Sequence, residues 1–161
     1  MGLLILSGMS GAGKSRAAGV LEDMGFFVTR NVPALLVPSW LESCRATMPD
    51  KFGYVLVHST YPGMDVQEFV RVLGELRGRE ACRVLFLDAE TGTIIRRYKE
   101  TRRRHPLWSG TGGLESAILL ERGMLVPVRA LADDVIDISG HPAGFLRKEL
   151  ERLYSPKKIG F

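Results

Sequence analysis

The sequence predicts an α/β fold in which helices cover both faces of a parallel sheet. Short apolar runs alternate along the chain with segments of helical periodicity. The runs are apolar throughout rather than at every second position, which is typical of strands buried on both faces. A glycine-rich turn directly follows the first run and leads into a helical pattern, as in a strand–turn–helix unit. With 161 residues, the chain is long enough to form one domain with its own hydrophobic core.

Five strands are predicted, and the segments between them have helical patterns. The predicted strands are residues 3–7, 26–29, 54–59, 82–89 and 134–139. The predicted helices are 14–25, 34–46, 65–78, a helix from about residue 91 into a basic segment, 114–132 and 145–154. Pro33 is placed to open the second helix, and Asp65 is a candidate N-cap of the third. We expect one domain over residues 1–154, followed at 155–161 by a tail or the start of a linker.

The composition favours a cytoplasmic protein without structural metal or disulfides. Cys44 and Cys82 are far apart and form no C-x-x-C pair, so we expect reduced thiols. The apolar start is too short for a signal peptide and has no basic flank. No apolar stretch approaches the ~20 residues that cross a bilayer. We therefore expect a cytoplasmic location and no contact with membranes.

The positive charge of the chain is concentrated in one segment. Residues 96–104, RRYKETRRR, contain six basic side chains and one acidic side chain, a local charge of +5 against +4 for the whole chain. The rest of the chain therefore has a net charge of −1. This distribution predicts one local anionic partner rather than a generally basic surface.

Residues 8–15, GMSGAGKS, match the Walker A pattern G-x-x-x-x-G-K-[ST], and a predicted strand and helix flank them as that motif requires. Glycines let successive backbone N–H groups point inward and form an anion-binding concavity, to which the helix dipole adds. We expect Lys14 to stabilise the β- and γ-phosphates of ATP or GTP, and the Ser15 hydroxyl to bind Mg²⁺. The expected binding residues are Gly8, Met9, Ser10, Gly11, Ala12, Gly13, Lys14 and Ser15. The fold is accordingly predicted to be a kinase-like P-loop NTPase.

The carboxylates that a phosphotransferase needs are difficult to find in the sequence. In a five-stranded kinase-like sheet, the third strand lies beside the first and supplies an acid near Mg²⁺ at its carboxyl end. That position falls here at about His58, and imidazole is a poor ligand for Mg²⁺. The second strand ends at Arg30 rather than at an acid. Asp88, at the end of the fourth strand, is a candidate for the catalytic acid and equally a candidate cap of the next helix.

Three interpretations of the basic segment stay open. In the first, the segment is a lid whose arginines, with Arg97 and Arg104 as candidates, close over the triphosphate and neutralise transition-state charge. Alternatively, it contacts the phosphates of a nucleic-acid backbone, or it is a solvated helix face. His105 and Pro106 are expected to break the helix after this segment. His105 is interpreted as a turn residue, and His141 as a loop residue without an evident partner.

Three stretches resemble the nucleotide-binding RNase adapter proteins of the RapZ type: SGMSGAGKSRAAGVLEDMGFFVTRNVP, FLDAETGTIIRRYKETRRRHPL and LESAILLERGMLVPVRALADDVID. The resemblance implies an amino-terminal P-loop domain that binds ATP and GTP and hydrolyses them slowly at best. It also implies a carboxyl-terminal domain, expected outside this chain, that makes most of the contacts with small regulatory RNA. Proteins of this type regulate RNA turnover and cell-envelope precursor synthesis.

The chain departs from that family in two places. Family members usually have Asp-Asn-Leu-Pro where this chain has Arg30, Asn31, Val32 and Pro33, and an Asp-containing segment associated with GTP where it has HSTY at 58–61. Only residues 8–15 therefore carry over as site residues. The sequence predicts a regulatory nucleotide-binding domain, a weak NTPase at most. The alternatives are a small-molecule or nucleotide kinase with an arginine lid, and an RNA-binding module acting through residues 96–104.

Overall fold

The structure is a computed structural model and describes residues 2–110 and 112–155. Strands and helices alternate along the chain, as the apolar runs and helical periodicities predict. The strands are β1 (Leu3–Gly8), β2 (Phe26–Arg30), β3 (Gly53–Val57), β4 (Cys82–Asp88) and β5 (Asp134–Asp137). The α-helices are α1 (Lys14–Asp23), α2 (Val37–Thr47), α3 (Val66–Arg77), α4 (Thr91–Glu100), α5 (Gly113–Ala130) and α6 (Phe145–Tyr154), and a short 3₁₀ helix, η1 (Ala34–Leu36), precedes α2.

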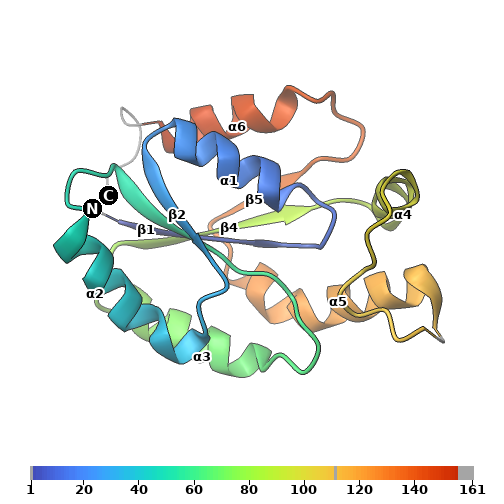
Figure 1. The fold of residues 1–161 in the computed structure, drawn as a ribbon, viewed down its shortest axis with the longest axis horizontal. Helices are drawn as coiled ribbons and strands as arrows, with labels where there is room; N and C mark the ends of the chain where they lie inside the picture. The colour runs from blue at the N-terminus through green and yellow to red at the C-terminus, as the bar shows by residue number, and fades with distance from the viewer. Residues whose placement is uncertain (1, 111, 156–161) are drawn as a thin grey trace.

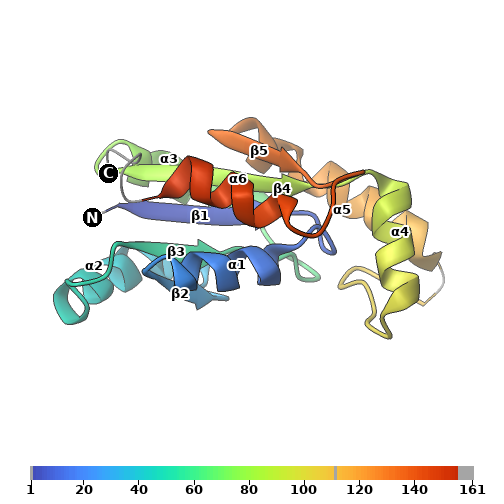
Figure 2. The ribbon, with the colours of Figure 1, turned by 90° about the horizontal axis from the view of Figure 1, so that it is seen from above.

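The five strands form one parallel sheet in the order β2-β3-β1-β4-β5. Helices α1 and α6 cover one face, and α2, α3 and α5 cover the other (Figure 1). Helix α4 lies beyond the carboxyl ends of the strands, next to the turn that follows β1 (Figures 1 and 2). The chain adds β2 and β3 on one side of β1 and β4 and β5 on the other, and in parallel sheets ligands bind at the carboxyl ends of the strands where the strand order reverses in this way.

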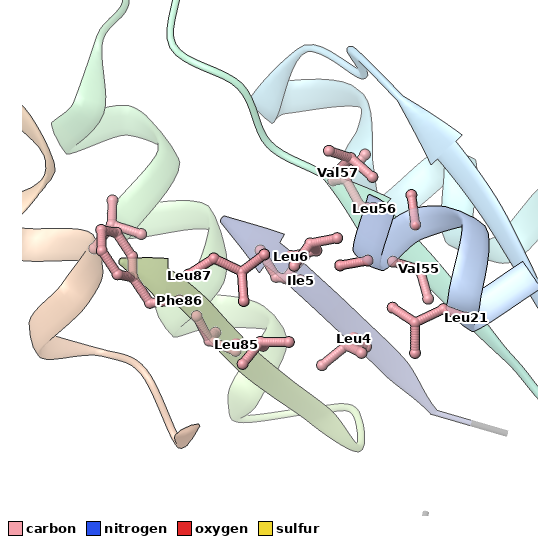
Figure 3. Packing of buried hydrophobic residues seen from close by; sticks show 14 of the residues in the cluster. Leu4, Ile5, Leu6, Leu21, Val55, Leu56, Val57, Leu85, Phe86 and Leu87 are labelled. Carbon is pink, nitrogen blue, oxygen red and sulfur yellow. The ribbon is translucent and has the colours of Figure 1, made fainter. Parts of the chain in front are cut away.

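The central strand β1 is buried along its whole length, because helices cover both faces of the sheet. Figure 3 shows its leucine and isoleucine side chains packed among those of β3 and β4 and against Leu21 of α1. The core is therefore continuous from one helical layer through the sheet to the other. It gives the turn after β1 a rigid support.

The predicted elements are confirmed, with differences at their ends. The predicted helix 34–46 is divided into η1 and α2, and Pro38 lies in the first turn of α2, where its missing N–H costs nothing. Asp65 caps α3 by accepting a hydrogen bond from the Glu68 N–H at 3.0 Å. Helix α4 ends at Glu100, so residues 102–104 of the basic segment lie outside it.

The predicted tail at 155–161 lies outside the described residues from residue 156 onward. Within residues 2–110 and 112–155, no helix is both long and apolar enough to cross a membrane.

Candidate functional site

The turn between β1 and α1 is shaped by glycines. Gly8, Gly11 and Gly13 have φ angles of 147°, 89° and 101°, which side-chain-bearing residues rarely adopt. A Cβ atom on Gly8 would lie 2.3 Å from the Leu87 carbonyl oxygen, so β1 and β4 approach closely only because this residue is glycine. On Gly11, a Cβ atom would lie 3.0 Å from the Tyr98 ring. The loop is therefore fitted against both β4 and α4.

Replacing Gly8 by alanine is expected to destabilise the fold by about 3 kcal/mol, because the new methyl group meets backbone atoms that have no room to move. Urea unfolding followed by circular dichroism measures the loss. The matched control is Gly19→Ala on the exposed side of α1, where nothing lies within 4 Å of the added Cβ atom. That variant is expected to be stabilised by about 0.5–1 kcal/mol, and equal effects of the two substitutions would contradict the prediction.

Lys14 folds back across the loop that precedes it. Its Nζ donates hydrogen bonds to the carbonyl oxygens of Gly8 at 3.0 Å and Met9 at 3.1 Å. Burial lowers the pKa of Lys14 to about 8, against the opposing effect of the Glu121 charge. A cation is thus held at the concave side of the loop, where Lys14 and the exposed Ser15 line the same cavity.

A buried carboxylate on α5 holds the middle of the loop. Glu121 is fully buried, and it accepts hydrogen bonds from the Ser10 N–H at 2.8 Å and from the Ser10 hydroxyl at 2.6 Å. Burial raises the pKa of Glu121, but hydrogen bonds from His105 and Ser10 lower it more, so the pKa lies below its usual value. An ionised carboxylate therefore fixes both polar groups of Ser10.

His105 connects this carboxylate to the chain that follows the basic segment. Its Nδ1 accepts a hydrogen bond from the Leu107 N–H at 3.1 Å, which places the proton of the neutral ring on Nε2. Nε2 lies 3.2 Å from the Glu121 Oε1 and donates to it. The loop, α5 and the segment after α4 thus share one buried hydrogen-bond network.

The loop faces a cavity of about 650 Å³ at the carboxyl edge of the sheet. Its walls come from the loop, from α4 with Thr101 and Arg103 after it, and from the ends of β2 and β3. Five basic side chains and one acidic side chain line it, for a net charge of +4: Lys14, Arg16, Arg30, Arg97 and Arg103 against Glu100. Such a cavity favours polyanionic ligands.

A second, smaller cavity of about 240 Å³ continues from the first toward β5. Gly13, Arg16 and Arg97 line both cavities. The far wall comes from the segment after β5 and the start of α6, where the His141 and Phe145 rings stack with their centroids 3.6 Å apart. The larger cavity is thus mainly cationic, and the smaller cavity beside it is partly lined by aromatic rings.

At the end of β3, beside the loop, the structure places His58. Its Nδ1 lies 3.2 Å from the Ser7 hydroxyl, and its ring stacks on Phe69 with centroids 3.7 Å apart. Burial, together with the Lys14 charge, lowers the pKa of His58 to about 4, so the ring is neutral. In residues 2–110 and 112–155, no group of three or more His, Cys, Asp or Glu side chains is placed to hold a metal ion. The residues fit a Mg²⁺ ion whose ligands are phosphate oxygens, water and the Ser15 hydroxyl.

Asp88 lies on the α5 side of the sheet. Its carboxylate pairs with Arg122 at 2.9 Å and Arg129 at 3.2 Å, both on α5, and accepts a hydrogen bond from the Ala89 N–H at 2.7 Å. It lines a separate cavity of about 250 Å³ with these two arginines. Asp88 thus anchors α5 to the sheet.

The two lid candidates are in different surroundings. Arg97 lines both cavities, and its Nη1 donates to the Gly11 carbonyl at 3.2 Å. Arg104 stacks over the Trp108 ring, with its Cζ 4.7 Å from the ring centroid, and the cavity is lined instead by its neighbour Arg103. Arg96 donates to the Thr93 hydroxyl at 3.1 Å rather than to Glu100, the pairing that their spacing suggests.

The sequence analysis does not predict Glu121 or His105 as residues of the site. Glu121 is one of two acidic residues in its helix, with Glu115, and His105 precedes a proline, as many turn residues do. The sequence does contain one indication of a buried role for Glu121: it lies on the same helical face as Ile118, Leu125 and Val128, which are buried with it. A charged residue on an apolar face is unfavourable unless it is hydrogen-bonded.

A family model described as the RapZ-like N-terminal domain matches residues 1–158. The curated relatives include a nucleotide-binding protein of Myxococcus xanthus, 39% identical over 96% of this chain and 53% of its own length. One of Clostridium kluyveri is 36% identical over 96% of this chain and 53% of its own length. This chain therefore spans about half the length of the curated relatives that it matches.

Among solved structures, the shikimate kinase of Acinetobacter baumannii, in complex with shikimate, has a TM-score of 0.58 at 14% identity and covers 95% of this chain and 93% of its own. The thymidylate kinase of Candida albicans has a TM-score of 0.54 at 13% identity and covers 94% of this chain and 90% of its own. At these identities the likeness is one of fold, which confirms the prediction of a kinase-like P-loop architecture.

Proposed function

This chain belongs to the RapZ-like N-terminal domain family, and from that premise we propose that it is a regulatory domain that binds a nucleoside triphosphate with Mg²⁺. The observation that carries the proposal is the Gly8–Ser15 loop, which lines the cationic cavity together with Arg16 and Arg97. The curated relatives, which are named nucleotide-binding proteins, support the ligand class.

In this proposal the triphosphate lies over the loop. Backbone N–H groups and the helix dipole of α1 stabilise its charge, and Lys14 exchanges its contacts with loop carbonyls for contacts with phosphate oxygens. The base enters the smaller cavity toward β5, between Arg97 and the segment that includes His141. Bound Mg²⁺ would neutralise part of the phosphate charge, and Ser15 is the residue that would hold it.

The site favours sensing of the nucleotide over its rapid turnover. A phosphotransferase requires a carboxylate near the metal and usually one near the acceptor. At the corresponding strand ends this chain has the neutral His58 and Arg30, and Asp88 is paired with Arg122 and Arg129. ATP and GTP are both proposed as ligands, with slow hydrolysis at most.

The position of Arg97 supports a lid rather than an RNA surface for the first half of the basic segment, because this side chain faces the cavity and contacts the loop. Regulatory RNA, or a protein that processes RNA, is proposed as a partner of the whole protein. A cytoplasmic location is part of the same proposal.

Two measurements test this function. Isothermal titration calorimetry with AMP-PNP and GMP-PNP in the presence of Mg²⁺ is expected to show one site per chain. AMP, which lacks the β- and γ-phosphates, is expected to bind much more weakly. Phosphate release from ATP is expected to be far slower than ~1 per second, the low end for kinases. Absence of triphosphate binding would refute the proposal, and faster turnover with an acceptor would establish the kinase alternative.

A further inference from the structure

We infer that the part of the large cavity at the carboxyl ends of β2 and β3 is a second binding site. Its ligand would be a small phosphate-bearing molecule that binds beside the nucleotide. This inference rests on the proposed nucleotide site and concerns a different part of the same cavity. It involves binding alone and no transfer of a group.

The order of the strands separates the two sites. The Gly8–Ser15 loop follows β1 at the centre of the sheet, and the smaller cavity lies toward β5 at one edge. Strand β2 forms the opposite edge, and Arg30 and Asn31 at its end line the large cavity. A nucleotide that extends from the loop toward β5 therefore leaves the β2 side of the cavity open to another molecule.

The cavity is lined by more cationic side chains than the bound triphosphate would contact. Lys14, Arg16 and Arg97 lie at the loop or contact it, and Mg²⁺ would neutralise part of the same phosphates. Arg30 and Arg103 remain, on the β2 side and on the segment after α4. Two further cations in one cavity are expected to repel each other unless an anion lies between them.

Neither of these arginines is neutralised by the protein. Within residues 2–110 and 112–155, neither Arg30 nor Arg103 forms a salt bridge or donates a side-chain hydrogen bond, and both are exposed. By contrast, eight other arginines among the described residues pair with a carboxylate: Arg45, Arg71, Arg77, Arg83, Arg122, Arg129, Arg147 and Arg152. The free guanidinium groups therefore face the cavity as donors.

Polar groups around the arginines define the class of ligand. Asn31 adopts a left-handed conformation, with φ of 62°, and lines the cavity together with Ser59 and Thr101. A guanidinium binds phosphate in a planar, bidentate geometry, and hydroxyl and amide groups suit the polar body of a small ester. These donors favour a phosphate monoester or phosphate itself over a cation or an apolar ligand.

The test is a titration of the isotope-labelled chain, first saturated with AMP-PNP and Mg²⁺, with inorganic phosphate and separately with ribose 5-phosphate. Both probes are expected to shift the NMR signals of Asn31 and Ser59 in a saturable way, and tighter binding of ribose 5-phosphate would assign the site to a phosphorylated metabolite. Arg30→Gln and Arg103→Gln are each expected to weaken binding by about tenfold. The matched control, Arg79→Gln, removes the same charge from an exposed position before β4 and is expected to change nothing.

The outcomes separate the two proposals. If AMP-PNP shifts the amide signals of Gly11 and Gly13 but neither phosphate probe shifts Asn31 or Ser59 in a saturable way, the second site is refuted and the nucleotide site stands. Equal weakening by Arg79→Gln would also refute it, by showing a general charge effect. If AMP-PNP leaves Gly11 and Gly13 unchanged, the nucleotide site and the inference drawn from it both fail.

Discussion

Replacing Lys14 by alanine is expected to weaken the binding of AMP-PNP with Mg²⁺ by about 100-fold, because the substitution removes the cation that lies over the loop. Calorimetry at a fixed salt concentration measures the change. Circular dichroism is expected to show an intact fold, since this side chain hydrogen-bonds to carbonyl groups of its own loop and is not among the side chains of the apolar core described for residues 2–110 and 112–155.

Lys148→Ala is the matched control for this prediction. It removes the same group from the exposed side of α6 and is expected to leave nucleotide affinity within about twofold of the original chain. Similar affinities of the Lys14→Ala variant and this control would mean that the triphosphate does not bind over the loop.

Replacing Glu121 by alanine is expected to destabilise the chain by about 3 kcal/mol, because Ser10 and His105 would lose a buried, charged hydrogen-bond acceptor. Urea unfolding measures the loss. Glu115→Ala, at an exposed position of the same helix, is expected to change stability by less than about 1 kcal/mol. Equal losses for the two substitutions would show that the buried network contributes little.

The same carboxylate is expected to make stability depend on pH. Because its folded-state pKa lies below the usual value of 4.5, the ionised group stabilises the fold above that pH. This stabilisation is lost as the pH falls below 4.5 and through the lowered folded-state pKa. Glu121→Gln cannot ionise, so the difference in stability between this variant and the original chain is expected to shrink in acid. A constant difference down to pH 3 would contradict the assignment.

Most of the fold could be predicted from the sequence, because each strand contains a run of apolar residues and the helices place their apolar residues on one face. The ends of elements were less certain. β3 ends at Val57 rather than at residue 59, because the register with β1 and β2 ends there, at the last residue of the apolar run. The division of residues 34–46 into η1 and α2 depends on Pro38 and on packing against α3.

The site was predictable where a local motif specifies it and unpredictable where distant residues meet. The Gly8–Ser15 loop is a contiguous pattern whose glycines the backbone geometry requires. Glu121 is 111 positions from Ser10 in the sequence, and only the packing of α5 against β1 brings them together. The arginines of the basic segment share one charge but not one role, because α4 ends at Glu100 and residues 102–104 follow a different path.

Helix α5 links the interior of the site to the protein surface. Glu121 accepts two hydrogen bonds from Ser10 in the interior, while the preceding residues Leu119 and Leu120 are 53% and 55% exposed. A hydrogen-bonded helix is displaced as a unit, so any movement of the loop that shifts Glu121 also reorients these two leucines. Thermodynamic reciprocity then applies: a partner that favours one orientation of the leucines changes the affinity of the loop by the same factor by which the loop's ligand changes the affinity for that partner.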